Sequence, residues 1–70
     1  MAFKYWCKLR GNKPVILFRM SAEGGEEVLA MQGWKPAPGS YEDILEGSFD
    51  YQMLGEDTAR FYFPEGFAED

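Results

Sequence analysis

The first twenty residues alternate apolar and basic side chains around a central Gly-Asn pair. In residues 3–10 the two kinds of position alternate with a period of two, which a half-buried strand requires because successive side chains point to opposite faces. Gly11 and Asn12 tolerate the positive φ of a two-residue turn, and residues 14–20 are rich in Val, Ile, Leu and Phe. The pattern therefore predicts a β-hairpin at the start of the chain.

The predicted turn also determines which side chains share a face. With Gly11 and Asn12 as the loop, Cys7 lies opposite Ile16, while Trp6 lies opposite Leu17 on the other face. The Cys7 face then packs against a later helix and becomes the core. The expected core residues are Phe3, Tyr5, Leu9, Ile16, Phe18, Ile44 and Leu45.

Residues 26–34 predict a third strand, which returns beside the second and completes a three-stranded antiparallel meander. The link before this strand holds either four or five residues, and the sequence leaves both registers open. In either register Arg19 meets an acidic residue, Glu26 or Glu27. The residues that would enter the core are Leu29 and Met31 with the shorter link, or Val28 and Ala30 with the longer one.

A short helix is expected after the Pro- and Gly-rich segment 35–39. Ser40 and Asp43 have the spacing of a capping box, which would open a helix through Glu46, and Gly47 is suited to end it. We expect this helix to turn an apolar face toward the sheet. That face consists of Tyr41, Ile44 and Leu45.

The last part of the chain predicts a strand and a helix. Alternation in residues 49–54 indicates a short fourth strand. An acidic pair at 56 and 57 suits the positive end of a helix dipole, so residues 58–63 are assigned to a C-terminal helix that ends before Pro64. The same residues also fit a strand, and we choose the helix. Residues 64–70 are expected to form a frayed tail, with Phe67 able to dock back on the core.

Length and composition limit the fold further. Seventy residues form one small α+β domain over residues 1–70. The single cysteine cannot form an intrachain disulfide, which fits a reducing cytoplasm. The longest apolar run is far too short to cross a bilayer, and the chain does not open with a basic-then-apolar leader, so we expect neither membrane insertion nor secretion by such a signal.

The sequence offers little for catalysis. It contains no histidine, and Cys7 is predicted to point inward, where a thiol is usually inert. One cysteine without histidine cannot complete a zinc site, and no phosphate-cradling or dinucleotide-binding loop occurs. We therefore expect a protein that is not an enzyme and that carries neither a metal nor another cofactor.

Charge is divided unequally along the chain. The first twenty residues carry five basic side chains and no acidic one, whereas the remaining fifty hold all twelve carboxylates and only Lys35 and Arg60 as cations. Such polarity favours a surface that meets a charged partner. The predicted partner-binding residues lie on the hairpin: Lys4, Trp6, Lys8, Arg10, Lys13, Leu17 and Arg19.

Two interpretations of the hairpin face that carries Lys4, Lys8 and Arg10 differ in where they place Trp6. If it is exposed between lysines, its ring would stack on a nucleic-acid base or a partner side chain, as in single-strand binders. Alternatively, Trp6 belongs with Val15 and Leu17 to an apolar stripe that a later helix covers, and the lysine side chains reach out from its margin. We favour the covered stripe, which still leaves room for a protein partner or a second subunit.

We expect a small protein-binding adaptor or regulator, whose partner is another protein or a second copy of the chain. A single-stranded nucleic-acid-binding module is the alternative, although the carboxylate-rich remainder of the chain would repel nucleic acid. A third interpretation is an acidic mimic of nucleic acid that occupies a basic site on a host enzyme. The residues standing in for phosphates would be Glu42, Asp43, Glu46, Asp50, Glu56 and Asp57.

Five segments of the chain carry a resemblance to a known group of proteins. They are KYWCKLRGNKPVILFRM at the front, then EEV, GW, the LEG that closes the short helix, and EDTARFYF near the end. Together they resemble small, functionally uncharacterised actinobacterial or actinophage proteins, which typically begin Y-x-L-V-R-R-x-G-x-P-x-x-L-F-R and have an acidic helix at the back. The resemblance implies an actinobacterial or phage setting, and it carries over no activity and no site residues.

Overall fold

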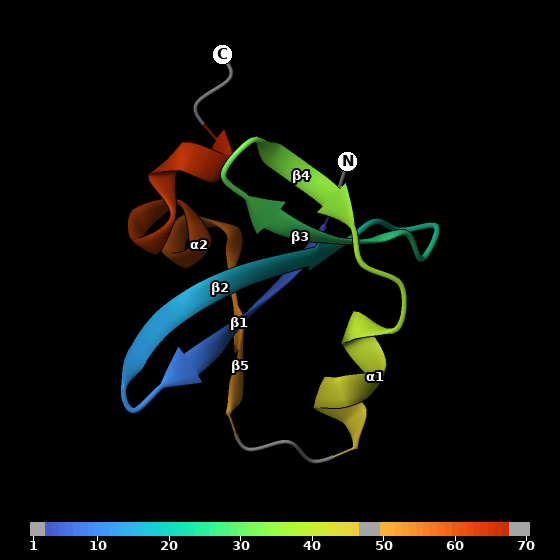
Figure 1. Cartoon of the computed structure of the whole chain (residues 1–70), viewed down its shortest axis with the longest axis horizontal. Helices are drawn as coiled ribbons and strands as arrows, with labels where there is room; N and C mark the ends of the chain where they lie inside the picture. The colour runs from blue at the N-terminus through green and yellow to red at the C-terminus, as the bar shows by residue number, and fades with distance from the viewer. Residues whose placement is uncertain (1–2, 47–49, 68–70) are drawn as a thin grey trace.

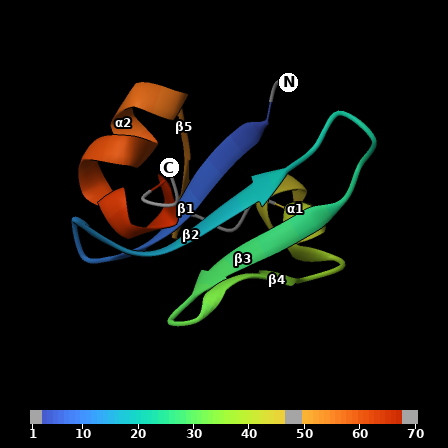
Figure 2. The ribbon, with the colours of Figure 1, turned by 90° about the horizontal axis from the view of Figure 1, so that it is seen from above.

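The computed structural model describes residues 3–46 and 50–67, which form one antiparallel sheet with helices on both faces (Figures 1 and 2). The strand order is β4-β3-β2-β1-β5. The elements are β1 (Lys4–Arg10), β2 (Lys13–Met20), β3 (Glu26–Ala30), β4 (Gly33–Pro36), α1 (Ser40–Leu45), β5 (Tyr51–Leu54), α2 (Glu56–Tyr62) and the 3-10 helix η1 (Pro64–Phe67). The expected α+β class is confirmed. No helix within these described ranges is long and apolar enough to cross a membrane.

β1 and β2 form the predicted hairpin, but one extra residue in β2 changes its register. Gly11 turns the chain with a φ of 64°, and the pairs beside the turn follow the expected register. The pairing then skips Val15, which forms a β-bulge, so that Cys7 lies opposite Leu17 rather than Ile16. Because successive side chains alternate between faces, this shift by one residue reverses β2 beyond the bulge. The predicted facing of β2 is therefore wrong.

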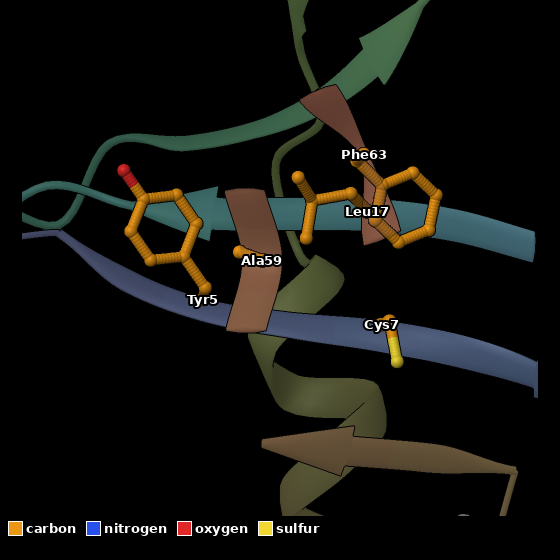
Figure 3. Packing of buried hydrophobic residues seen from close by; sticks show 5 residues of the cluster. All are labelled: Tyr5, Cys7, Leu17, Ala59 and Phe63. Carbon is orange, nitrogen blue, oxygen red and sulfur yellow. The ribbon is translucent and has the colours of Figure 1, made fainter. Parts of the chain in front are cut away.

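The main core lies on the face of the sheet that α2 covers (Figure 3). Tyr5, Cys7 and Leu17 project from the central strands toward Ala59 and Phe63 of the helix and its C-cap. Complete burial of a leucine side chain stabilises a fold by about 1.5–3 kcal/mol, and Leu17 has no exposed surface. The partly buried side chains around this cluster are Phe3, Leu9, Leu29, Trp34, Leu54 and Phe67.

α1 covers the opposite face, where Trp6 is fully buried. The indole stacks on Phe18 with a centroid distance of 5.6 Å and 7° between the ring planes, and the ring of Tyr41 in α1 meets the indole edge-on at 5.3 Å. The Nε1–H of Trp6 has no hydrogen-bond partner among the described residues, so packing holds the ring in place. The helix-covered position expected for Trp6 is confirmed, although its neighbour on β2 is Phe18 and not Leu17.

α1 begins without the predicted capping box. Its N-cap is Gly39, which lies in the left-handed region with a φ of 89°. The carboxylate of Glu26 accepts hydrogen bonds from the backbone N–H groups of Gly39 at 2.7 Å and of Tyr41 at 3.0 Å. The hydroxyl of Ser40, expected to cap the helix, instead donates to the carbonyl of Ala37 at 2.6 Å. The side chain of Glu26 on β3 thus fixes where α1 starts and where the ring of Tyr41 meets the sheet.

The segment predicted as a single third strand forms a second hairpin. β3 ends at Ala30, the chain turns at Met31 and Gln32, and β4 begins at Gly33. The φ of Gly33 is 116°, a conformation that a residue with a Cβ adopts only with strain. The predicted three-stranded meander is therefore extended by a fourth strand at one edge, and β5 adds to the other edge.

The link between β2 and β3 has five residues, so that Arg19 pairs with Glu27, one of its two predicted partners. The side chain of β3 that packs against the main core is nevertheless the partly buried Leu29 and not Val28, because the bulge has already exchanged the faces of β2. Met31, which the shorter link would have placed in the core, is fully exposed.

α2 confirms the predicted C-terminal helix, but the expected frayed tail is wrong over η1. The Nε1–H of Trp34 donates to the carbonyl of Gly66 at 3.1 Å, and the ring of Phe67 lies 5.5 Å from that of Tyr5. A Cβ on Gly66 would come within 3.2 Å of the Trp34 ring, so the backbone of η1 approaches β4 closely. η1 therefore closes the core beside α2, and the last three residues lie outside the described ranges.

Several predicted positions differ in burial from the expectation. Ile16 and Phe18 are half-buried on the face that α1 covers, and Leu45 is 66% exposed. The predicted fourth strand is confirmed as β5, which pairs with β1. Three predicted positions lie outside the described residues: Gly47, Phe49 and the side chain of Asp43.

The observed facing of β2 predicts an order of stability among three alanine variants. Leu17→Ala should lower the free energy of unfolding by about 2–5 kcal/mol, because it leaves a cavity in the main core. Ile16→Ala should cost less, and Met31→Ala should change little, because the side chain of Met31 is exposed. Urea denaturation measures all three, and a larger loss for Ile16→Ala than for Leu17→Ala would contradict the bulged register.

Glu26→Ala should loosen α1, because it removes both carboxylate contacts to the start of the helix. Losing an N-terminal cap typically costs about 1 kcal/mol. Hydrogen exchange followed by NMR should show faster exchange of the Gly39 and Tyr41 amides. Glu23→Ala, which changes an exposed residue of the β2–β3 link, is the matched control. Unchanged exchange at these two amides in Glu26→Ala would show that the carboxylate does not hold the helix.

Candidate partner-binding surface

The hairpin tip, defined here as Lys8, Arg10 and Lys13, brings together three of the predicted binding cations. Arg10 and Lys13 face each other beside the turn and are exposed, and Lys8 is half-buried two pairs further along the strand. Neither of the two ion pairs within residues 3–46 and 50–67 involves a tip cation. Like charges on directly opposed positions weaken a hairpin, so this arrangement favours binding of an anionic group from outside.

Two of the predicted binding residues are unavailable to a partner. Trp6 and Leu17 have no exposed surface, and their side chains lie on opposite faces of the sheet. We therefore correct the prediction that they contact a partner directly. Lys4 is exposed, but it lies at the other end of β1 from the hairpin tip, with its Nζ 5.7 Å from the centroid of the Tyr41 ring.

Arg19 is engaged within the fold. Its Nε–H donates to Oε1 of Glu27 at 2.7 Å. The guanidinium carbon lies 4.4 Å from the ring centroid of Phe3 and 4.0 Å from that of Trp34, which is a cation–π arrangement on both rings. Arg19 thus joins β2 to β3, β4 and the start of the chain, and the structure gives it a structural role that needs no partner.

A groove that the sequence did not predict opens between the two hairpins. β3 pairs with β2 only along residues 18–20 of β2, and beyond this point the hairpins diverge (Figures 1 and 2). We call the space between them the apolar groove, which has a volume of about 390 Å³. Its lining residues are Val15, Ile16, Leu17, Leu29, Ala30, Met31, Gly33, Phe63 and Glu65. Gly33, which follows Met31 and Gln32, was the one sequence signal for the β3–β4 turn beside this groove.

A second depression adjoins the apolar groove at the hairpin tip. This basic hollow has a volume of about 550 Å³ and shares Val15 and Ile16 with the groove. Lys8 and Arg10 contribute its positive charge, and Asp50 contributes one carboxylate. The bulge residue Val15 therefore lies where an apolar surface meets a cationic one.

The acidic residues considered as a nucleic-acid mimic do not form one surface. Glu42 on α1 and Glu46 at its C-cap are exposed, whereas Glu56 and Asp57 open α2 on the other face of the sheet. Glu56 also pairs with Arg60 at 2.9 Å, so part of its charge is neutralised locally. A row of carboxylates that imitates a phosphate backbone would have to lie along one side of the molecule.

The thiol of Cys7 is enclosed in the main core. Burial raises the pKa of this thiol above its ordinary value of 9.0, which disfavours the thiolate that nucleophilic chemistry requires. The described part of the chain also contains no group of three or more His, Cys, Asp or Glu side chains that could hold a metal ion.

Comparison of the chain with protein-family models, with curated proteins and with solved structures found no match. The surface must therefore be interpreted from its own geometry and charge.

The raised pKa values of the core predict a loss of stability in alkali. Burial raises the pKa of Cys7, and burial followed by the charge of Glu56 raises that of Tyr5. Well below pH 9.0 both groups are protonated in the folded and unfolded chains, so their contribution is constant. As the pH rises further, the unfolded chain releases these protons first, and the folded state loses stability.

Urea midpoints at about pH 8 and about pH 10 measure this effect within each variant. Cys7→Ala should show a smaller fall between the two pH values than the wild type, and polar thiol reagents should label native Cys7 slowly. An equal fall in Cys7→Ala and wild type, or rapid labelling of the native protein, would contradict the buried, protonated thiol.

Proposed function

We propose that this chain is a non-enzymatic protein-binding adaptor or regulator, and that its binding surface is the hairpin tip with the adjoining apolar groove. The observation that carries the proposal is the junction at Val15, where exposed cations and an open apolar depression lie side by side. Protein interfaces combine an apolar centre with a polar rim in this way. Val15 and Met31, at the margin of the groove, are both exposed large apolar side chains.

Two features favour a protein partner over single-stranded nucleic acid. The stacking ring on which the nucleic-acid interpretation depended, Trp6, is fully buried beneath α1. The formal net charge of the chain is −5, and its acidic residues occur on both faces of the sheet. A protein partner with complementary charge can meet the cations of the tip without following a phosphate backbone across the molecule.

Charge reversal at Lys8, Arg10 and Lys13 should weaken capture of a protein partner in a pull-down from native lysate. Once the partner is isolated, the association rate at low salt should fall by about tenfold or more, because exposed cations act by long-range steering. The difference should shrink as salt is added. Dissociation should change less than association.

Charge reversal at Lys35 is the control, because this lysine is exposed on β4, away from the hairpin tip. Capture that is unaffected by the triple tip variant would contradict the proposed surface. Oligonucleotide binding with micromolar or tighter affinity at physiological salt, and no protein capture, would favour the nucleic-acid alternative.

A further inference from the structure

The N-terminal half of β2 has one open edge. Residues 13–17 of β2 have no partner on β3, whose pairing with β2 covers residues 18–20 alone. In an antiparallel sheet, alternate residues direct their backbone N–H and C=O groups to the same side of the strand. Some backbone groups of residues 13–17 are therefore directed away from β1 toward the apolar groove, where β3 no longer meets them.

The surroundings of this edge differ from those of the two outer edges of the sheet. β4, at one side, and β5, at the other side, each span only four residues. The open edge of β2 is instead bordered by apolar side chains from β3, from the β3–β4 turn and from the segment after α2. Strand addition needs this combination, because backbone groups supply affinity and side-chain pockets supply specificity.

We infer that the open edge of β2 receives an extended peptide segment of a protein partner as an added β-strand, with apolar side chains in the apolar groove and a carboxylate at the hairpin tip. This inference rests on the proposed protein-binding function and names the kind of segment that is bound. The charges along the edge determine where the bound segment carries its carboxylate. Lys8, Arg10 and Lys13 outnumber Asp50 at the tip, whereas Glu65 in the groove disfavours a carboxylate there.

A random twelve-residue peptide library displayed on phage, selected on the full chain, supplies the probe. The enriched peptides should place two or more apolar residues at alternate positions and an acidic residue at one end of that stretch. One enriched peptide is then synthesised and titrated against the protein. Hydrogen exchange followed by NMR should show that amides within residues 13–17 gain protection on binding, which a ligand bound only through side chains would not produce.

Two variants test the groove without disturbing the core. Met31→Lys changes a fully exposed side chain of the β3–β4 turn, and Val15→Lys changes the half-exposed bulge residue. Each should weaken peptide binding by about tenfold or more, the range in which a central interface residue acts. Met53→Lys on β5 is the matched control, because Met53 is exposed to about the same extent as Val15 and lies away from the groove.

The outcomes separate this inference from the proposed function. Absence of enriched peptides together with tip-dependent capture of a partner protein would overturn strand addition and leave the adaptor function intact. Failure of both peptide selection and capture would overturn both. Protection along β4 or β5 in place of residues 13–17 would also overturn the inference. The amides of residues 13–17 could instead become protected without peptide as the protein concentration rises, while the protein shows the mass of a dimer. That result would overturn the peptide as occupant of the open edge and assign a second copy of the chain in its place.

Discussion

The β-bulge at Val15 determines how the rest of the molecule packs. It adds one residue to β2 and sets Leu17, rather than Ile16, against Cys7 in the main core. Because side chains alternate along a strand, the same residue reverses every later position of β2. Phe18 is thereby placed beside Trp6 beneath α1. Because β3 pairs with β2 beyond the bulge, the same reversal places Leu29 on the main-core face of the sheet.

A second constraint is that β1 is covered on both faces. Three consecutive residues, Tyr5, Trp6 and Cys7, are buried, which a strand achieves only when each face packs against another layer. α2 and η1 cover one face and α1 covers the other. In a chain of seventy residues, these very short helices can cover both faces because large aromatic rings bury much apolar surface per residue.

The proposed binding surface arises from the same departures from regular geometry. Where β3 diverges from β2, the fold leaves an open backbone edge and the apolar groove beside it, and the bulge places Val15 at the point where this groove meets the basic hollow. Arg19 contributes to the fold in a different way, because its contacts with Glu27, Phe3 and Trp34 are internal. Lys8, Arg10 and Lys13 make no ion pair among the described residues, and they adjoin the apolar groove, so charge and apolar surface meet at this end of the hairpin.

The sequence by itself determined the elements whose signals are local. The alternation around Gly11-Asn12 predicted the hairpin, an acidic pair and Pro64 bounded the C-terminal helix, and the clustering of cations placed a basic tip beside the turn. Only the tertiary structure decided the bulge, the cap that Glu26 supplies to α1 and the docking of η1, because each depends on residues distant in the chain or on which face of a strand is buried. The apolar groove was also decided by the tertiary structure, because its lining residues come from β2, β3, the β3–β4 turn and the segment after α2, and a space between elements has no local sequence pattern.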